Sequence, residues 1–280
     1  MQTIPKKIHY CWLSGEDFPD SVKKTIDTWK EFLPDYELVL WDTNRFDVNS
    51  VACVKDACNS RRWAFAADYI RLYALYTEGG IYLDTDVIVR KKFDDLLNYS
   101  FFSGIDWHFG LYNRKYPKIH KYRKPVNEII SDIPWAGINA AILGAEKGNT
   151  LVKDLLDWYE DNQNEIKPSS FDVEEMLFEC LAPEIFATIA ENYGFDRTKN
   201  ITQNLQDNMV IFSSSIFGAD IVQLSENSYA VHCTNSSWKS QKKWYHNPII
   251  RKLLGVREVK KTKFDFFDEF KNFERFNFPE

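Results

Sequence analysis

Two aspartates separated by one residue are the feature of this sequence best suited to chemistry. Asp84 and Asp86 lie within the apolar run IYLDTDV, which reads as an extended strand. In a strand, residues i and i+2 project to the same face, so the two carboxylates are expected roughly 7 Å apart and directed at one ligand. Carboxylate oxygens are hard ligands that favour Mg²⁺ or Mn²⁺, and such ions complete their coordination shell with water and substrate phosphates. The pair therefore predicts a divalent metal and a ligand that carries a diphosphate.

The apolar residues around this pair favour a metal site over a position on a solvated face or in a turn. A bare DxD arises often by chance, usually on a solvated face or in a turn. Inside an apolar strand, however, an unpaired ionised carboxylate costs several kcal/mol. The sequence therefore disfavours the solvated-face and turn interpretations.

A second charged pair, Asp68 and Arg71, precedes the first. The two residues stand three positions apart in a segment, residues 63–78, whose apolar residues predict a buried helix. This spacing allows a purely structural ion pair. If the pair faces a cavity, the Asp could instead accept hydrogen bonds from sugar hydroxyls, and the Arg could form a bidentate contact with hydroxyl or phosphate oxygens. Both interpretations stay open at this point.

The elements that position these residues alternate between strand and helix, which predicts an α/β fold. Gly79 and Gly80 end the predicted helix, because glycine adopts the positive φ of a helix C-cap. Residues 108–134 have no periodicity and predict a long loop on the acceptor side. Strands are expected over residues 4–12, 36–41, 81–89, 136–144, 209–213 and 229–233, and helices over residues 19–32, 63–78 and 151–162.

The overall composition excludes several classes of protein. The chain has 280 residues, of which 44% are hydrophobic and 27% charged, as in an ordinary globular protein. Its net charge of −6 argues against a nucleic-acid partner, which would require a basic surface. The five cysteines lack CxxC spacing, and we find neither a signal peptide nor the run of about eighteen apolar residues that a transmembrane helix needs. These features predict a cytoplasmic protein with free thiols.

Three stretches of the chain resemble the DxD-containing family 32 glycosyltransferases. They are RRWAFAADYIRLYALYTEGGIYLDTDV, the opening IPKKIHYCW and the later YAVHCTNSSW. The family includes bacterial capsular-polysaccharide transferases and yeast initiation mannosyltransferases, and the chain is also similar to the catalytic core of the large clostridial glucosylating toxins. The resemblance covers most of residues 4–100 and resumes over residues 209–238. It implies a GT-A (Rossmann-like) fold with a mixed, mostly parallel sheet flanked by helices, a UDP-sugar donor and retention of the anomeric configuration.

The resemblance also implies roles for the residues at matching positions. Asp68 and Arg71 would hold the donor sugar. Asp86 would bind the metal directly, while Asp84 would contact the ribose or sugar and the water shell of the metal. Asn139 would contact the donor sugar, although an Asn at a strand end can also bond only to backbone.

Further residues of the resembling stretches would surround the nucleotide. Trp12 would stack on the base, and Cys11 and Asn44 occupy donor-contacting positions. His232 would complete the metal shell, although a His at a strand end is often a satisfied core residue. When a lid closes, the diphosphate would be contacted by Ser236, Ser237 and Trp238.

One motif departs from the family. Many members have Thr-Gly-Pro before a helix, whereas this chain has Leu181-Ala182-Pro183. Acceptor-side inferences from that motif are therefore not carried over.

The expected organisation is one catalytic domain and a tail. Residues 1–258 would form the GT-A domain, with the nucleotide sugar mainly on residues 1–100 and the acceptor and lid mainly on residues 101–240. The tail, residues 259–280, carries seven phenylalanines among charged residues, with helical spacing at positions 266, 270 and 273. It either packs on the domain or docks on a membrane surface or partner, which would place the enzyme at the inner membrane face.

The expected function is metal-dependent, retaining transfer of a hexose from a UDP-sugar to a glycan or lipid-linked acceptor, in capsular or surface polysaccharide or glycolipid synthesis. Front-face attack, in which the departing phosphate takes the proton of the acceptor, is favoured because no isolated carboxylate is identified as a nucleophile. Alternatives are a toxin-like protein glycosyltransferase and a catalytically silent sugar-nucleotide-binding module. A phosphohydrolase of the haloacid dehalogenase type is disfavoured, because its DxDx[TV] signature normally lies on the first strand.

Overall fold

The computed structural model describes residues 3–108, 135–170, 182–218 and 225–233, which form two sheets and the helices around them. The larger sheet has seven strands in the order β2-β1-β3-β6-β5-β8-β7, and the smaller has three in the order β4-β10-β9. The larger sheet consists of β1 (Lys7–Cys11), β2 (Glu37–Trp41), β3 (Gly80–Leu83), β5 (Phe101–His108), β6 (Trp135–Ala145), β7 (Gln203–Asn204) and β8 (Met209–Phe212). The smaller consists of β4 (Val87–Val89), β9 (Phe217–Gly218) and β10 (Ala230–His232).

The larger sheet is mixed and mostly parallel, as the sequence predicts. Strand β1 runs parallel to β2 and β3, and β5 runs parallel to β8. Strand β6 is antiparallel to both β3 and β5, and β7 is antiparallel to β8. The strands β2, β1, β3, β5 and β8 therefore point in one direction, and their carboxyl ends meet at one edge of the sheet.

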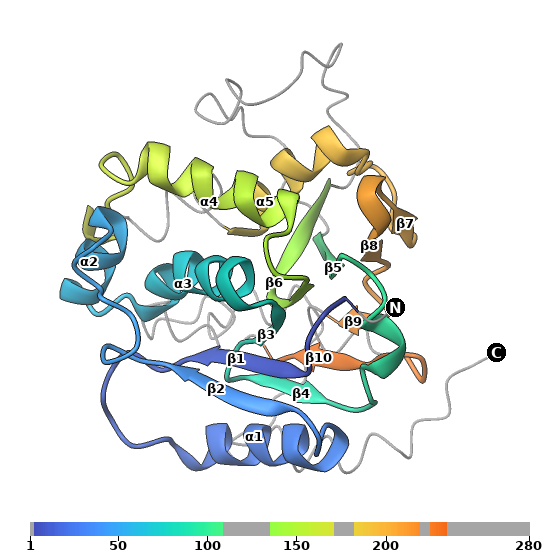
Figure 1. The fold of residues 1–280 in the computed structure, drawn as a ribbon, viewed down its shortest axis with the longest axis horizontal. Helices are drawn as coiled ribbons and strands as arrows, with labels where there is room; N and C mark the ends of the chain where they lie inside the picture. Colours follow the sequence, from blue (N-terminus) through green and yellow to red (C-terminus); the bar gives the residue numbers. More distant parts are fainter. Residues whose placement is uncertain (1–2, 109–134, 171–181, 219–224, 234–280) are drawn as a thin grey trace, which may run out of the picture. The chain divides into compact units, whose positions relative to one another are not determined.

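Helices cover both faces of this sheet. Figure 1 shows α1 (Asp20–Phe32) on one side of β1 and β2, and α3 (Trp63–Glu78) and α4 (Thr150–Asn162) on the other. The remaining α-helices are α2 (Ala52–Asn59) and α5 (Ala182–Ala190). Short 3₁₀ turns occur at Asp94–Leu96, Pro168–Ser170, Glu191–Tyr193 and Gln206–Asn208. The arrangement confirms the α/β fold with a sheet flanked by helices.

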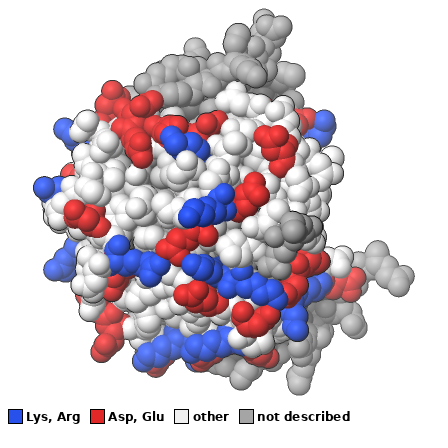
Figure 2. Space-filling model, viewed as in Figure 1, with Lys and Arg blue, Asp and Glu red and all other residues white. Residues whose placement is uncertain are grey.

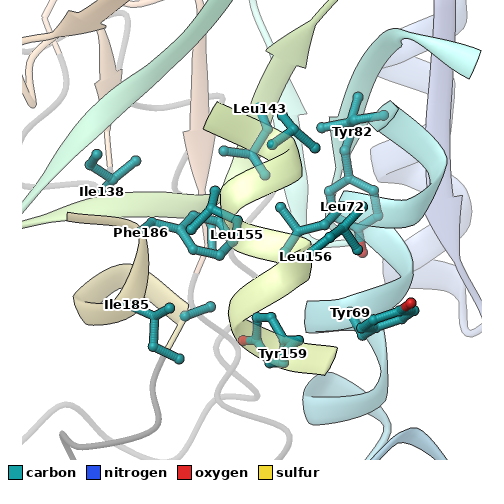
Figure 3. Close-up of a cluster of buried hydrophobic side chains, with 14 of the residues drawn as sticks. Tyr69, Leu72, Tyr82, Ile138, Leu143, Leu155, Leu156, Tyr159, Ile185 and Phe186 are labelled. Atoms are coloured by element: carbon teal, nitrogen blue, oxygen red, sulfur yellow. The ribbon is translucent and has the colours of Figure 1, made fainter. Parts of the chain in front are cut away.

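The core beside the site lies between α3, α4, α5 and β6. Figure 3 shows Leu72 of α3 next to Leu156 of α4, with Phe186 of α5 near Leu155. Leu72 and Phe186 are no more than 1% exposed. Burying side chains of this size contributes about 1.5–3 kcal/mol each, so this packing holds α3 firmly against the sheet. The rigid placement matters because α3 carries Asp68 and Arg71.

The continuous strand predicted over residues 81–89 is wrong. Strand β3 ends at Leu83 and β4 begins at Val87, and the Val87 N–H donates to the Asp84 carbonyl at 3.0 Å to close a turn between them. The reason is topological, because β3 pairs with β1 and β6 in the larger sheet while β4 pairs with β10 in the smaller one. The two aspartates therefore lie in a turn between sheets, which the sequence analysis disfavoured.

The other expected strands and helices are present, most within a few residues of their predicted bounds. Helix α3 has the predicted bounds, and Gly79 and Gly80 adopt φ values of +67° and +121° after it. The sequence analysis did not anticipate α2, α5, β5, β7 or β9. Strand β5 was missed because its single charged residue, Asp106, and two small residues interrupt the apolar pattern.

The described residues all lie in one compact unit, Met1–Trp238. The second unit, Lys239–Glu280, lies outside them, as does nearly all of the expected loop over residues 108–134. The boundary at residue 258 and the role of the tail over residues 259–280 therefore stay predictions. Across the described ranges, we find no helix with the length and apolar character required to cross a bilayer. On the face drawn in Figure 2, acidic and basic side chains are interspersed.

A buried histidine in β1 forms hydrogen bonds with β2 and with the residue that follows α3. His9 in β1 is fully buried, and its Nε2 lies 2.8 Å from the carbonyl oxygen of Gly79. The indole N–H of Trp41 in β2 donates to Nδ1 at 3.0 Å. Nδ1 therefore accepts and Nε2 donates, which defines a neutral tautomer. Burial lowers the pKa of His9 below its ordinary value of 6.5, with the Gly79 carbonyl opposing the shift.

We expect this histidine to make stability depend on pH. Because the folded-state pKa lies below the unfolded-state value of about 6.5, the unfolded chain binds a proton that the folded chain does not. The free energy of unfolding should therefore fall as pH drops below 6.5, by up to about 1.4 kcal/mol per pH unit. Urea unfolding between pH 5 and pH 8 measures this slope. The matched variant His9→Gln can also donate and accept but does not titrate, so it should lose this part of the slope; an identical slope in both proteins would contradict the assignment.

Candidate active site

The carboxyl ends of β1, β2 and β3 bring several predicted residues to one edge of the sheet. Cys11 ends β1 in register with Trp41, the last residue of β2, and the backbone N–H of Trp12 donates to the Trp41 carbonyl at 3.0 Å. Asp84 follows β3 directly, on the other side of β1. Crevices outside the carboxyl ends of parallel strands are where α/β sheets bind ligands. The topology therefore gathers the predicted nucleotide-binding residues at a suitable place.

Trp12 and Asn44 extend from this edge. The partly exposed indole of Trp12 donates to the Glu16 carbonyl at 2.6 Å and packs edge-on against Phe18, with 5.1 Å between ring centroids. Asn44 is exposed in the turn after β2, where the Asp42 carboxylate accepts from its backbone N–H at 3.0 Å and from its side-chain amide at 3.1 Å. Both side chains are held in place by local contacts while remaining accessible.

The turn after β3 and the end of β10 form a three-residue cluster. One ligand atom from each of Asp84, Asp86 and His232 lies within 4.8 Å of the others. Strand β10 positions the histidine, because His232 pairs with Val87 across the smaller sheet. The Cys233 N–H donates to the Asp86 carbonyl at 3.0 Å, and His232 Nε2 lies 3.2 Å from Asp86 Oδ1. Residues 146 positions apart in the sequence thus meet at one point.

The cluster fits a hard divalent cation. Its side chains are partly exposed, at 26% for Asp84, 20% for Asp86 and 23% for His232. Two carboxylates and one imidazole provide three of the six ligands that octahedral Mn²⁺ or Mg²⁺ requires, which leaves positions for water and phosphate oxygens. Burial disfavours the charged imidazole, but Asp86, Asp84 and Asp106 outweigh it and raise the pKa of His232. The concentration of negative charge is what a cation would neutralise.

Arg71 joins the two acidic groups of the donor side. Its guanidinium is only 3% exposed and lies 2.9 Å from Asp68 Oδ1 and 3.5 Å from Asp84 Oδ1. It also donates to the Ala67 carbonyl at 3.1 Å and to the Ala140 carbonyl in β6. The structural ion pair with Asp68 is therefore present, and the same arginine reaches into the predicted metal site. Arg71 connects α3, the turn after β3 and β6.

Burial changes the ionisation of the side chains around Arg71. Burial raises the pKa of Asp68 to about 7, with Arg71 opposing the shift and Asp84 adding to it. Burial likewise raises the pKa of the Cys11 thiol to about 12, against smaller opposing effects of Arg71 and Tyr82. The Cys11 side chain is therefore a neutral thiol at physiological pH, and it lies within the electrostatic reach of Asp84, Asp68 and Arg71.

Asn139 lies in a bulge of β6 beside Asp84. Residues 139–142 of β6 lie opposite the single residue Gly104 of β5, because the register shifts between Ser103↔Leu143 and Ile105↔Ile138. The Asp84 N–H donates to the Ala141 carbonyl at 2.9 Å, so the bulge adjoins the aspartate turn. The Asn139 side-chain oxygen accepts from the Ala141 N–H at 2.9 Å. Its Nδ2, which is buried, has no hydrogen-bond acceptor among the described residues. Bulges often re-aim a side chain next to an active site.

Sequence reasoning missed two residues near the cluster. The Tyr82 hydroxyl donates to Asp84 Oδ1 at 2.9 Å, and its ring lies 4.8 Å from the Arg71 guanidinium. Its position two residues before Asp84 was a usable signal, because such residues share a strand face. Asp106 of β5 acts electrostatically on His232 and was also missed. Ser236, Ser237 and Trp238 lie outside the described residues, so their placement stays a prediction.

Comparison with known proteins identifies the segment that carries this geometry. Residues 19–102 match the family described as "Glycosyltransferase sugar-binding region containing DXD motif". We call these matched residues the DXD region. The DXD region spans α1 to the start of β5 and includes Asp68, Arg71, Asp84 and Asp86. The match confirms the resemblance to DxD-containing glycosyltransferases for these residues.

Individual relatives cover a part of the chain similar in extent to the DXD region. Inositol phosphoceramide mannosyltransferase 3 of Schizosaccharomyces pombe is 34% identical over an alignment of 100 residues that covers 34% of this chain and 28% of that protein. Subversion of eukaryotic traffic protein A of Legionella pneumophila is 27% identical over an alignment of 119 residues that covers 33% of this chain and 18% of that protein. The chain thus spans less than a third of the length of these relatives.

Among solved structures, PaToxG Glycosyltransferase is similar at 16% identity and a TM-score of 0.45, covering 68% of this chain and 69% of that one. This similarity is too low to assign the fold, so the fold is described from the strand order and strand pairing of this chain.

Proposed function

We propose that the protein is a metal-dependent, retaining glycosyltransferase that moves a hexose from a UDP-sugar to a glycan or lipid-linked acceptor. The proposal rests on one observation. Ligand atoms of Asp84, Asp86 and His232 lie within 4.8 Å of one another, and the two aspartates belong to the DXD region. Such a cluster binds a divalent cation, which in turn binds a diphosphate. We propose a role in the synthesis of capsular or surface polysaccharide or of glycolipid.

Each residue of the site has a task in this reaction. Asp84, Asp86 and His232 would hold Mn²⁺ or Mg²⁺, which acts as a Lewis acid that stabilises the nucleotide leaving group when bound. Trp12, Cys11 and Asn44 would line the nucleotide end, and Asp68 and Asn139 would bind hydroxyls of the donor sugar. Arg71 would keep Asp68 and Asp84 in place, because its guanidinium already contacts both carboxylates.

Retention is proposed to follow from front-face attack. The bond between the anomeric carbon and the diphosphate oxygen breaks, and its electron pair leaves on that oxygen. The acceptor oxygen bonds to the same face of the anomeric carbon, and its proton passes to the departing phosphate. The anomeric centre resembles an oxocarbenium ion during this step.

Donor hydrolysis tests the proposal. Purified protein would be incubated with a panel of UDP- and GDP-sugars in Mn²⁺, Mg²⁺ or EDTA, and the release of nucleotide would be measured. We expect release from one UDP-hexose in the presence of metal and none in EDTA. Silence across the panel, with no binding of any donor by calorimetry, would overturn the proposal. Binding of a donor without turnover would instead support the sugar-nucleotide-binding module.

A further inference from the structure

The order of strands along the active edge of the sheet arranges the proposed site as a series. Asn44 follows β2, Cys11 ends β1, Asp84 follows β3 and Asn139 lies in β6, and these strands are neighbours in that order. In the proposed function, on which this inference rests, this series runs from the nucleotide, through the metal and diphosphate, to the donor sugar. The next strand in the sheet is β5. The acceptor that receives the donor sugar should therefore lie over β5.

Strands β5 and β6 continue past their neighbours as a two-stranded ribbon at this edge. The register of β3 with β6 reaches only Leu83↔Ile142, and that of β8 with β5 reaches only Gly104↔Phe212. Beyond these points β5 and β6 pair with each other, from Ile105↔Ile138 to His108↔Trp135. Figure 1 shows the two strands side by side. The bulge that carries Asn139 lies where the ribbon begins.

Asp106 is the carboxylate of this ribbon. Its cross-strand partner is Gly137, and the neighbouring pair, Ile105 and Ile138, is buried in the core at no more than 1% exposure. Because successive residues of a strand alternate between faces, Asp106 and Gly137 lie on the face opposite that pair. Asp106 is partly exposed, and Asn139 is two residues beyond Gly137.

The start of α5 closes the ribbon at Gly137. A Cβ at position 137 would lie 3.0 Å from Cβ of Pro183 and 3.3 Å from its carbonyl oxygen. Glycine therefore allows the first turn of α5 to approach β6 directly beside Asp106.

The charge of Asp106 is unsuited to binding the diphosphate of the donor. Among the described residues, the cluster of ligand atoms within 4.8 Å contains Asp84, Asp86 and His232, and Asp106 is not part of it. A further carboxylate beside a site that takes a diphosphate repels that diphosphate, so its presence weakens donor binding. A carboxylate is favourable there only toward a hydroxyl that donates to it or toward a centre that becomes positive in the transition state.

We propose that Asp106 is a catalytic residue of the acceptor side, which accepts a hydrogen bond from an acceptor hydroxyl next to the attacking one and so orients the attacking oxygen toward the anomeric carbon. Two strand spacings of about 4.8 Å separate β3 from β5, so a hexose attached to the diphosphate at β3 reaches toward Asp106. The proton of the attacking hydroxyl passes to the departing phosphate, and Asp106, which binds the neighbouring hydroxyl, stays ionised throughout. In the absence of a carbohydrate acceptor, water takes the same place; it has two protons, so it donates one to Asp106 while the other passes to the departing phosphate.

Donor hydrolysis by Asp106→Asn tests this role, because water is then the oriented nucleophile. The variant keeps the size of the side chain, and Asp106→Ala provides a second reading if one of the two folds poorly. We expect kcat for hydrolysis of the UDP-hexose in Mn²⁺ to fall by about 10²-fold, because misplacing a nucleophile has effects of this size. The Kd for UDP-hexose should not rise, because both variants remove a negative charge that repels the diphosphate. Asp157→Asn on the exposed face of α4 is the matched control and should leave both constants unchanged.

Four results would overturn the inference. An unchanged kcat in both variants would remove Asp106 from catalysis, while the proposed function would stand. A loss of kcat matched by an equal loss of donor affinity would place Asp106 on the donor or metal. Formation of a glycosyl azide by Asp106→Ala in added azide would identify Asp106 as a covalent nucleophile. If wild type itself releases no nucleotide, the proposed function fails, and this inference fails with it.

Discussion

Replacing Asp86 by alanine is expected to abolish metal-dependent cleavage of the donor, with a loss of at least about 10³-fold in kcat/KM. Asp86 lies in the turn between the two sheets and contacts His232 at 3.2 Å. Its removal takes one of two anionic ligands from the cluster, and the remaining Asp84 is already shared with Tyr82 and Arg71. Isothermal titration calorimetry with Mn²⁺ should show a matching loss of metal affinity.

Graded variants make this expectation specific to the metal site. His232→Ala should have a smaller effect, about 10- to 100-fold, because a neutral ligand contributes less charge than a carboxylate. Asp157→Asn, an aspartate on the exposed face of α4, should leave Mn²⁺ affinity and kcat/KM unchanged. Full activity of Asp86→Ala in Mn²⁺ would show that the cluster does not hold the catalytic ion.

Replacing Arg71 by methionine is expected to lower the free energy of unfolding by about 3–5 kcal/mol and to remove activity. The guanidinium is 3% exposed and balances Asp68 and Asp84, so its loss leaves two buried or half-buried carboxylates without their cation. It also removes the side-chain donor to the carbonyl oxygens of Ala67 and Ala140. Urea denaturation followed by circular dichroism measures the change.

Two companion variants separate the buried role from a general effect of charge. Arg45→Met removes an exposed arginine paired with Glu78 at 2.6 Å, and surface pairs of this kind contribute at most about 1 kcal/mol. Arg71→Met combined with Asp68→Asn should recover part of the stability, because one uncompensated carboxylate becomes neutral, but should stay inactive. Equal losses for Arg71→Met and Arg45→Met would refute the central position of Arg71.

The sequence was informative where local patterns decide structure. The apolar periodicity of α3 and the Gly79-Gly80 stop signal are local properties, and the helix has the predicted bounds. The residue types and spacing of Asp84 and Asp86 pointed to a metal and a diphosphate, and residues 19–102 match the DXD sugar-binding region of glycosyltransferases. The chemistry of a residue type and the spacing of near neighbours can both be read directly from the sequence.

The prediction failed where a residue depends on partners far away in the chain. Val87 begins a strand because β10, more than 140 residues later, pairs with β4, and no local pattern near Asp84 reports this change of sheet. For the same reason the sequence analysis favoured a strand over the turn that is present. The bulge at Asn139 depends likewise on the register between β5 and β6.

The sequence by itself determined which chemistry this protein is equipped for, because carboxylates, an imidazole and a guanidinium keep their character in any fold. The tertiary structure alone decided which of these groups act together. It brought His232 to Asp86, joined Arg71 to both Asp68 and Asp84, and put Asp106 on the strand next to Asn139. These contacts depend on strand order and register, which are set by packing of the whole domain and not by the spacing of neighbours along the chain.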